Sequence, residues 1–495
     1  MVHPALLVAP IAAPLLAALL AIAFPRGAVA AALSAVGVAL VASLVLVVEV
    51  ARTGTGAALA IGGWPPPLGI ALEADGLSAM FLLAASTIGL GVLVVAQGPF
   101  GWTGRETRKG YSFWPLALCL LAALNAIFLS RDFFNFYVGL ELLSLSAVAL
   151  VALDGKREAI EAALRYLMFA LVGSLLYLLG AALLYAQYGT LDIGLIAASA
   201  ETNGPTLVAA GLMTAGLAAK TALFPLHAWL PSAHTGAPAV ASAMLSALVP
   251  KASFFILVRV WFDALPGQAG PGLTLVLGTM GAVAIVYGSI LALLQERLKL
   301  IIAYSTVAQL GYLFLVFPLA GGDSTAQPWF AGAWTGGMVH AVSHGLAKAA
   351  MFLCAGAMMA AAGGDKLSDV RGIVAKMPLA TFAFALAAVT LMGLPPSGGF
   401  LAKYLMLTAA FASGAWVWGA VVLAGGLLAA LYLYRPLASL FAPADPDRTF
   451  TSVPLRTELV PLALALVAVL LGVASQFPYD ILQVGRSVAA EAGLE

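Results

Sequence analysis

Ionisable side chains inside long apolar runs are the residues of this sequence that could carry out chemistry. One glutamate, four lysines and two histidines lie within such runs: Glu141, Lys220, Lys251, Lys348, Lys403, His340 and His344. A charged side chain at the centre of a bilayer costs roughly 2.5–3.5 kcal/mol on insertion scales. Because groups of this kind within a membrane mark ion or proton pathways by default, the sequence predicts a buried polar route for protons.

The segment MVHAVSHGLAKAAMF shows the clearest spacing. His340, His344 and Lys348 recur at i, i+4 and i+8, so on a helix they share one face about 12 Å long. Histidine titrates near neutral pH, and a row of such groups can pass protons through bridging water. Two histidines four residues apart can also bind zinc. No HExxH motif and no third ligand accompany them, so we expect neither a metal nor a cofactor.

Two apolar runs are interrupted in the middle. GLAAKTALFPLHAWLPSAHTGAP is interrupted after Lys220, and VTLMGLPPSGGFLAKYLML is interrupted before Lys403. The predicted helix breaks are Pro225, Pro231, Pro395, Pro396 and Gly398. Proline removes a helix donor, and in lipid the freed carbonyl groups need partners from protein or from water in a cavity. Broken helices in corresponding positions of two halves indicate a transport site.

Composition determines the class of protein that must hold these groups. Only 9% of the 495 residues are charged and 62% are hydrophobic, with a mean hydropathy of +1.03. A soluble domain is about a quarter charged, which excludes a water-soluble globule and a disordered chain. The net charge of +1 excludes a nucleic-acid binder. Long continuous apolar runs differ from the alternating pattern of a barrel, so we predict an all-α polytopic membrane protein.

Fourteen runs are long enough to span a membrane, for which about 20 apolar residues are needed. Their approximate limits are 4–24, 28–50, 76–97, 112–130, 133–153, 160–187, 206–225, 238–262, 273–294, 299–319, 330–361, 377–410, 414–440 and 457–475. The broken spans are the seventh and the twelfth. An offset of five spans inverts the topology, so helices 4–8 and 9–13 are predicted to be two inverted five-helix repeats.

The whole chain, 1–495, is expected to form a single membrane domain. Its parts are three N-terminal helices (1–97), a first repeat (110–262), a second repeat (273–440) and a last helix (455–475). The N-terminus lacks the basic region of a cleaved signal peptide, so we interpret it as the first span.

Basic residues predict the orientation. Four lie in even-numbered connections or at the C-terminus: Arg52, Arg131, Arg259 and Arg486. Fourteen lie in odd-numbered connections: Arg26, Arg105, Arg108, Lys109, Lys156, Arg157, Arg297, Lys299, Lys366, Arg371, Lys376, Arg435, Arg448 and Arg456. The positive-inside rule then places the odd connections in the cytoplasm and both termini on the other side of the cell (inner) membrane.

Several motifs, in order along residues 110–420, resemble the antiporter-like proton-channel subunits. These occur in respiratory complex I, in membrane-bound hydrogenase and formate hydrogenlyase complexes, and in multisubunit cation/proton antiporters. The matching segments are GLELLSLS, FPLHAWLPSAHTGAPAVASAMLSALVPK, KLIIAYSTVAQLGYL, HGLAKAAMFL and GLPPSGGFLAKYLML. The resemblance implies fourteen helices, two inverted repeats and broken helices 7 and 12.

The resemblance also implies roles for individual residues. Glu141 and Lys220 correspond to the family's glutamate–lysine pair, and Lys251 to its central lysine. His344 and Lys348 match the family's HxxxK relay, and Lys403 its terminal lysine. Two residues depart from the family pattern: Ser232 stands where an aspartate is usual, and Pro250 precedes Lys251, where a kink is expected.

We therefore predict a proton-translocating component of a larger complex, with other integral membrane subunits as partners. The D-type component of a multisubunit cation/proton antiporter is favoured by the short C-terminus and the LHAWLPSAH segment. The alternatives are a pumping component of complex I or of a membrane-bound hydrogenase, and a stand-alone channel or membrane enzyme with a histidine site. No GxGxxG, CxxC or haem motif is found, so any redox chemistry belongs to partners. Whether sodium is also carried stays open.

Overall fold

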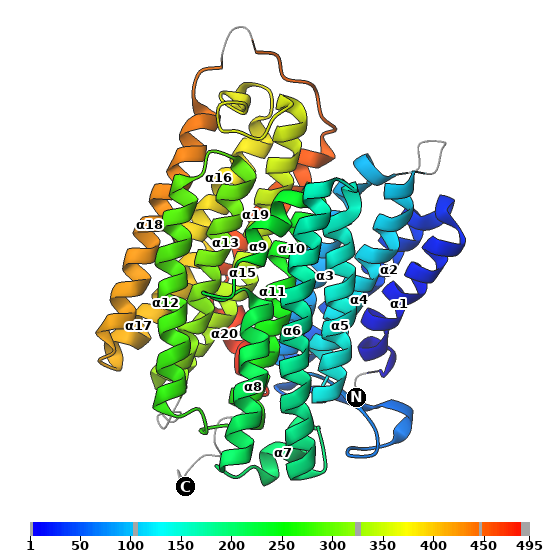
Figure 1. The fold of residues 1–495 in the computed structure, drawn as a ribbon, viewed down its shortest axis with the longest axis vertical. Coiled ribbons are helices and arrows are strands. Elements are labelled where there is room, and N and C mark those ends of the chain that lie inside the picture. Colours follow the sequence, from blue (N-terminus) through cyan, green and yellow to red (C-terminus); the bar gives the residue numbers. More distant parts are fainter. Residues whose placement is uncertain (1–2, 102–106, 322–327, 445–447, 487–495) are drawn as a thin grey trace.

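Long helices that run roughly side by side make up the computed structural model of this chain (Figure 1). The structure describes residues 3–101, 107–321, 328–444 and 448–486. Within them, the strands form one antiparallel hairpin, in which β1 (Ala57–Ala60) pairs with β2 (Ala71–Ala74). The prediction of an all-α polytopic membrane protein is confirmed.

The first half of the chain contains eleven α-helices among its described residues. They are α1 (Ala5–Ala23), α2 (Ala28–Thr53), α3 (Gly76–Phe100), α4 (Arg108–Leu129), α5 (Phe133–Val151), α6 (Arg157–Tyr188), α7 (Ile193–Ser199), α8 (Gly204–Thr221), α9 (Trp229–Gly236), α10 (Ala239–Ala247) and α11 (Val249–Val258). Side-chain caps begin several of them: Asp75, Thr107 and Asp132 each accept a hydrogen bond from the backbone N–H three residues later. These caps satisfy donors that a helix start leaves unpaired.

The second half continues with nine α-helices in the described part. They are α12 (Pro271–Leu294), α13 (Leu298–Phe314), α14 (Val316–Ala320), α15 (Pro328–Ala362), α16 (Pro378–Met392), α17 (Gly398–Ala412), α18 (Trp416–Phe441), α19 (Arg456–Val473) and α20 (Gln476–Gln483). Short helical segments lie between the elements of both halves: η1 (Pro25–Gly27), η2 (Ile61–Gly63), η3 (Ala152–Asp154), the π-helical η4 (Arg259–Ala264) and η5 (Ile373–Ala375).

Twelve helices of the described chain are long and apolar enough to cross a membrane. The two predicted spans outside that set are the seventh and the twelfth. The seventh divides into α8 and α9, with Pro225 in the non-helical link and Pro231 in the first turn of α9. The twelfth divides into α16 and α17, with Pro395 and Pro396 in the link and Gly398 as the first residue of α17.

Both α8 and α16 end in the same way. Each terminates at a residue with left-handed backbone, Ala222 (φ 61°) and Gly393 (φ 81°) respectively. A helix end leaves carbonyl groups without helical partners, and a left-handed cap satisfies only some of them. The interior of the bundle thus holds two helix C-termini whose carbonyl oxygens can accept hydrogen bonds from other side chains.

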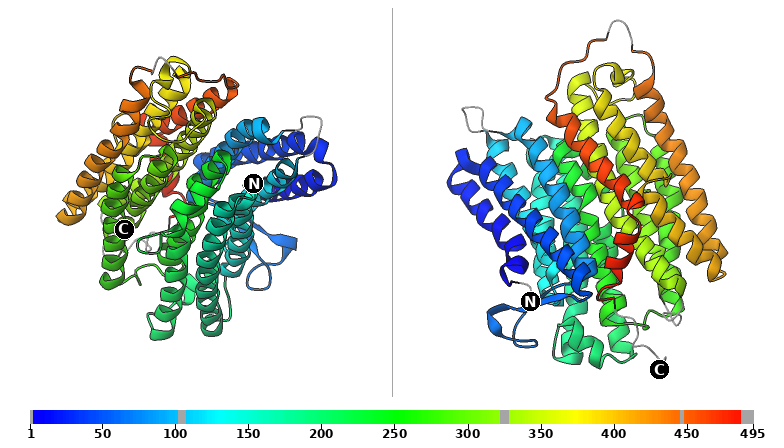
Figure 2. Two further views of the ribbon diagram at one scale, coloured as in Figure 1. Left: turned by 45° about the horizontal axis from the view of Figure 1, so that its top comes forward. Right: turned by 180° about the vertical axis from the view of Figure 1, so that it is seen from behind.

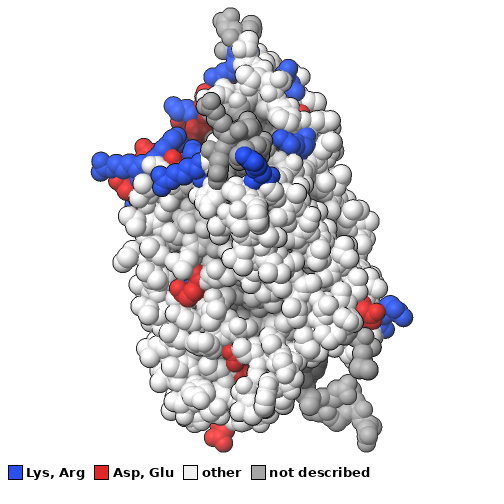
Figure 3. All heavy atoms as spheres, turned by 90° about the vertical axis from the view of Figure 1, so that its right-hand side faces the viewer, with Lys and Arg blue, Asp and Glu red and all other residues white. Residues whose placement is uncertain are grey.

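Charge is concentrated at one end of the molecule. Figure 3 shows Lys and Arg gathered there, above a broad surface that carries few charges. Arg297 and Arg448 form ion pairs with Asp365 (2.6 Å) and Asp369 (3.1 Å) at this basic end. The backbone N–H of Lys366 and the guanidinium of Arg448 lower the pKa of Asp369.

The start of α1 and the helix α20 lie toward the end of the molecule opposite the basic end (Figure 1).

Two basic residues that the sequence analysis assigned to connections are in fact buried: Arg259 is 3% exposed and Lys299 is 8% exposed. Both find partners inside the protein, which the sequence did not predict. Arg105 lies outside the described residues.

Arg259 belongs to a buried ion cluster that joins α3 to η4. Its two Nη atoms donate to both oxygens of Asp75 (2.6 and 2.8 Å), and also to Asp263 (2.5 Å) and the Ser78 hydroxyl (2.9 Å). Burial alone would raise the pKa of Asp75, but the Arg259 guanidinium holds it below its usual value. The cluster links the start of α3 to the end of the eighth span.

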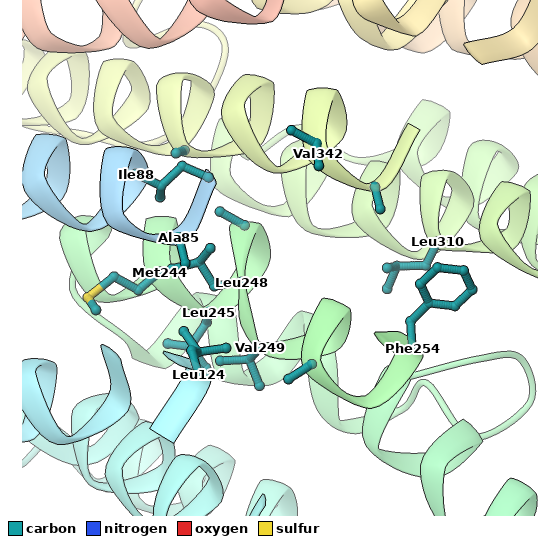
Figure 4. Packing of buried hydrophobic residues seen from close by; sticks show 14 of the residues in the cluster. Ala85, Ile88, Leu124, Met244, Leu245, Leu248, Val249, Phe254, Leu310 and Val342 are labelled. Atoms are coloured by element: carbon teal, nitrogen blue, oxygen red, sulfur yellow. The ribbon is translucent and has the colours of Figure 1, made fainter. Parts of the chain in front are cut away.

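The apolar core lies where the two halves of the bundle meet. Figure 4 shows Ile88 of α3 near Leu248, Leu124 of α4 near Leu245 and Val249, and Phe254 of α11 beside Leu310 of α13, all of them buried. The long helix α15 packs against α10, α13, α16, α17 and α19. Polar side chains of α15 therefore face protein rather than lipid.

Candidate functional site

Glu141 and Lys220 form an ion pair between α5 and α8. The Lys220 Nζ lies 3.6 Å from Glu141 Oε1 and donates a shorter hydrogen bond, 2.8 Å, to the Ser144 hydroxyl. Ser174 of α6 donates to the same oxygen of Glu141. The Lys220 side chain is 4% exposed and that of Glu141 is 23% exposed. Each ion therefore has a second, uncharged partner, and the carboxylate stays accessible from outside the chain.

Close helix packing sets the position of Lys220. A side chain at Gly173 of α6 would stand 2.8 Å from the Gly216 carbonyl oxygen and 3.1 Å from Lys220 Cγ. The two glycines thus allow α6 and α8 to approach closely, as small residues do between membrane helices. Lys220 lies in the last turn of α8, where the helix dipole favours a cation.

Lys251 is the next buried lysine along the predicted route. It lies on α11, is 3% exposed and donates to the Ser246 carbonyl oxygen (2.6 Å). It also lines a small cavity together with Ile88 and Gly345. The eighth span divides at Leu248, between α10 and α11.

The two departures from the family pattern have simple local structures. Pro250 lies in the first turn of α11, where a missing N–H leaves no helical hydrogen bond unmade. Ser232 donates to the Trp229 carbonyl oxygen (3.0 Å) within α9.

Lys251 and Lys348 are connected through hydroxyl groups between α10 and α13. The hydroxyl of Ser246, whose carbonyl holds Lys251, lies 2.8 Å from the hydroxyl of Thr306. The neighbouring Ser305 accepts a hydrogen bond from Lys348, which also donates to the Ile302 carbonyl oxygen (2.9 Å). Polar groups of α10 and α13 thus lie between the two ammonium groups.

The histidines of α15 lie on one face, as their spacing predicts. The rings of His340 and His344 are parallel, with their centres 5.8 Å apart. His340 Nε2 lies 3.1 Å from the Gln309 carbonyl oxygen. Within the described chain, both ring nitrogens of His344 are buried without a hydrogen-bond partner. Buried polar atoms usually have a partner in the protein or in ordered water, so these two nitrogens are able to bond a bridging water molecule.

Lys403 of α17 caps the end of α16. Its Nζ donates to the carbonyl oxygens of Leu391 (2.8 Å) and Met392 (3.1 Å), and it lies 4.5 Å from the centre of the Tyr312 ring. The side chain of Gln309 donates to the same Leu391 oxygen (3.2 Å). Because the Gln309 backbone contacts His340, one residue connects the histidine row to Lys403.

The structure therefore brings five of the seven predicted residues into one buried polar region: Lys251 and Lys348 on either side of the Ser246–Thr306 contact, His340 and Lys403 joined through Gln309, and His344 on α15 between them, with no hydrogen bond of its own among the described residues. Glu141 and Lys220 form a separate pair, and no hydrogen bond described for the chain joins Lys220 to Lys251. The four lysines are at most 5% exposed. None of them faces lipid.

The connecting residues were missed by the sequence analysis. Ser144, Ser174, Ser246, Thr306 and Gln309 supply the hydroxyl and amide groups between the charges. Small hydroxyl residues are frequent in membrane helices, so no sequence signal marked them. His234 of α9 was also not selected; it is 1% exposed, and its ring stacks on Phe352 with centres 4.7 Å apart. Among the described residues, no three His, Cys, Asp or Glu side chains form a group able to hold a metal.

Comparison with protein families gives a match over residues 130–429 to the family described as NADH:quinone oxidoreductase/Mrp antiporter, transmembrane. Among curated proteins, the N subunit of the NADH-quinone oxidoreductase of Desulforudis audaxviator is 38% identical over 86% of this chain and 83% of its own length. The D subunit of the Na(+)/H(+) antiporter of Alkalihalophilus pseudofirmus is 31% identical over 79% of this chain and 76% of its own length.

A solved structure of the Mrp complex from Dietzia sp. contains a similar chain. The two superpose with a TM-score of 0.88 at 25% sequence identity, covering 97% of this chain and 96% of the other. Nearly the whole bundle is therefore shared, including the first three helices and α19, which lie outside the family match.

Proposed function

Since the chain belongs to the NADH:quinone oxidoreductase/Mrp antiporter transmembrane family, we propose that it translocates protons as a multi-pass subunit of a larger membrane complex. The supporting observation is the polar region that runs from Lys251 to Lys403, buried in a bundle that carries few other charges. Burial of so many titratable groups is costly, and proton relays are the usual reason for it.

We propose that protons enter from the basic end near Lys220. The ionised Glu141 at 3.6 Å stabilises the ammonium form of Lys220. When that carboxylate turns away, burial favours the neutral amine, and the proton passes toward Lys251 through bridging water. It then moves through the Ser246–Thr306 hydroxyls to Lys348, along the α15 histidines, and to Lys403, from which it leaves on the far side.

Substitution of Lys251 tests this route. In vesicles that contain the assembled complex, Lys251→Met should reduce proton flux to background, because it removes the first member of the buried polar region. The exposed Lys376 provides the matched control, and Lys376→Met should leave flux unchanged. Co-purification of the partner subunits shows that assembly is intact. Normal flux in an assembled Lys251→Met complex would contradict the route.

We further propose that the complex is a multisubunit cation/proton antiporter and that this chain is its D-type component. Support comes from the Dietzia Mrp complex, whose matching chain shares the fold over 97% of this chain. A redox-driven pump is the second candidate, favoured by the 38% identity to the N subunit of an NADH-quinone oxidoreductase.

Isolation of the complex separates these candidates. Mass spectrometry identifies the co-purifying integral membrane subunits, and vesicles show whether NADH oxidation or an imposed pH gradient drives proton movement. An antiporter responds to the gradient, and flux measured at several sodium concentrations shows which cation is exchanged. NADH-driven pumping would replace the antiporter assignment.

The proposed topology places the basic end in the cytoplasm and both termini on the non-cytoplasmic side of the cell membrane. Helices 4–8 and 9–13 form its two inverted repeats. The shared left-handed ends of α8 and α16 support the repeat. A cysteine introduced at Gly155 should react with an impermeant thiol reagent only from the cytoplasm, and one at Thr202, in the exposed connection between α7 and α8, only from outside. The opposite pattern would reverse the orientation.

A further inference from the structure

An apolar groove opens near the basic end of the molecule, away from the proton route. It has a volume of about 450 Å³, within the roughly 300–1,000 Å³ typical of ligand sites. Its walls come from the end of α3, the start of α10, the second half of α15 and the residues before α19, including Val95, Pro99, Val240, Leu353, Ala357 and Val453. Figure 2 shows α19 running beside α3 when the molecule is seen from behind.

Arg456 stands beside this groove with no ion-pair partner among the residues that the structure describes. It is the first residue of α19, and its Nη2 lies 3.5 Å from the position of a side chain at the groove residue Gly98. Its Nε is buried and has no hydrogen-bond partner in the described chain. Two other arginines of the basic end, Arg297 and Arg448, are paired with aspartates.

The acidic residue nearest to Arg456 in sequence is engaged elsewhere. Glu458 accepts a hydrogen bond from the backbone N–H of Ala380, at the start of α16 (3.1 Å). Glu458 thus caps a different helix, and the guanidinium of Arg456 remains available to an anion from outside the chain.

We propose that the groove binds an anionic phospholipid, with an acyl chain between α3, α10 and α15 and the phosphate on Arg456. The groove is apolar and lies near the end of membrane helices, where a lipid tail meets its headgroup. Guanidinium groups bind phosphate oxygens through paired hydrogen bonds. The cytoplasmic leaflet carries a negative surface potential from anionic lipids, and the proposed topology places the basic end at this leaflet. The groove thus matches the acyl chain of a phospholipid, and the arginine matches its phosphate headgroup.

Lipid photolabelling of the assembled complex tests this proposal. The complex is placed in vesicles of phosphatidylcholine with a trace of phosphatidylglycerol that carries a photoreactive group on its acyl chain. Mass spectrometry should find label on residues 95–100 and 353–360. Ala360→Trp, at an exposed position of the groove wall, should reduce this labelling severalfold by filling the space.

Headgroup selectivity is tested at Arg456. Arg456→Gln should lower labelling by the phosphatidylglycerol probe about fivefold, the change expected from one basic residue near an anionic surface. Labelling by the matching phosphatidylcholine probe should stay the same, and Arg456→Lys should keep most of the anionic preference. Arg165→Gln, which removes an exposed charge on α6, is the control and should change nothing.

Two results would overturn the proposal. Equal labelling by both probes in the wild-type protein would show that Arg456 selects no phosphate headgroup. Cross-links from the groove residues to a partner subunit would show that protein, and not lipid, fills the groove. Proton flux provides no part of this test, so its outcome is independent of the proposed transport function.

Discussion

Two buried cations of this protein, Arg259 and Lys220, are held in different ways. Arg259 makes contacts of 2.5–2.9 Å with Asp75, Asp263 and Ser78. Lys220 lies 3.6 Å from Glu141, and each member of that pair has an uncharged serine as a closer partner. In the first arrangement both Nη atoms of Arg259 are held by carboxylates, whereas in the second each ion has an uncharged alternative partner.

The difference indicates what each pair does. A planar guanidinium with two carboxylates has one favourable geometry, and it ties α3 to η4. A flexible lysine with a loosely placed carboxylate has several arrangements of similar energy, as a group that exchanges protons requires. Lys403, at the other broken helix, is held by carbonyl oxygens at the end of α16 and by the Tyr312 ring.

Removal of the Arg259 side chain should cause the largest loss of stability. In Arg259→Gln the buried carboxylates lose their counter-charge, which costs about 3–5 kcal/mol for a broken buried pair. The thermal midpoint of the purified protein in detergent should fall accordingly, with little complex recovered. Arg52→Gln, which breaks a largely exposed pair with Glu49 at 3.8 Å, should leave the midpoint unchanged. An unaltered midpoint in Arg259→Gln would remove the distinction between the two pairs.

The same cluster has a defined pH dependence. Because the pKa of Asp75 is lowered below its usual value of 3.8, its stabilising contribution is present above that value and is lost as the pH falls through the lowered pKa. The difference in thermal midpoint between wild type and Asp75→Asn should stay constant from pH 8 to pH 5 and shrink only below about pH 4. A difference that vanished near pH 6 would mean that Asp75 is not held ionised by Arg259.

Loss of either member of the Glu141–Lys220 pair should abolish function and leave the fold intact. Glu141→Ala and Lys220→Ala should each lower proton flux by about a hundredfold or more, the scale on which proton-transfer groups act. Their thermal midpoints should stay near wild type. The exposed residues Glu158 and Lys156 provide the controls, as Glu158→Ala and Lys156→Ala. Near-normal flux in both pair variants would eliminate this pair from the route.

His344 provides a sharper test, since its ring nitrogens lack partners in the described structure. His344→Phe keeps the size of the ring and removes the proton carrier. Flux should fall at least about tenfold, less than for the ion pair because bridging water can replace part of a relay. His3→Phe, at the exposed start of the chain, is the control. Unchanged flux would show that protons bypass the α15 histidines.

The smallest effect is expected at Ser174. Ser174→Ala removes a hydroxyl that donates to Glu141. The carboxylate then loses one hydrogen bond, whose net contribution is about 1 kcal/mol, so we expect flux to change by a factor of about five. Ser199→Ala removes a hydroxyl that only bonds its own helix and should be silent. If Ser174→Ala equalled Glu141→Ala in effect, the serine would itself be a member of the relay.

Most of the fold and the charged residues of the site were predictable. Hydrophobic runs indicated the spans, and the proline-rich segments at Pro225 and Pro395 indicated where the helices divide. The hydroxyl connections at Ser246 and Thr306 were not predictable, because a serine or threonine in an apolar helix usually bonds its own backbone. Arg259 was assigned to a connection, because sequence alone does not show that Asp75, 184 residues away, neutralises it.

The sequence by itself determined that this chain spans a membrane many times and that its few interior charges must be shielded. Hydrocarbon solvates neither bare charges nor unpaired backbone groups. The composition and the helix-breaking residues are therefore enough to predict the spans and the shielding of the interior charges. Only the tertiary structure decided which groups meet. Contacts such as Lys220 with Ser144, or Lys403 with the end of α16, depend on the rotation and depth of separate helices, and those are set by packing across the whole bundle.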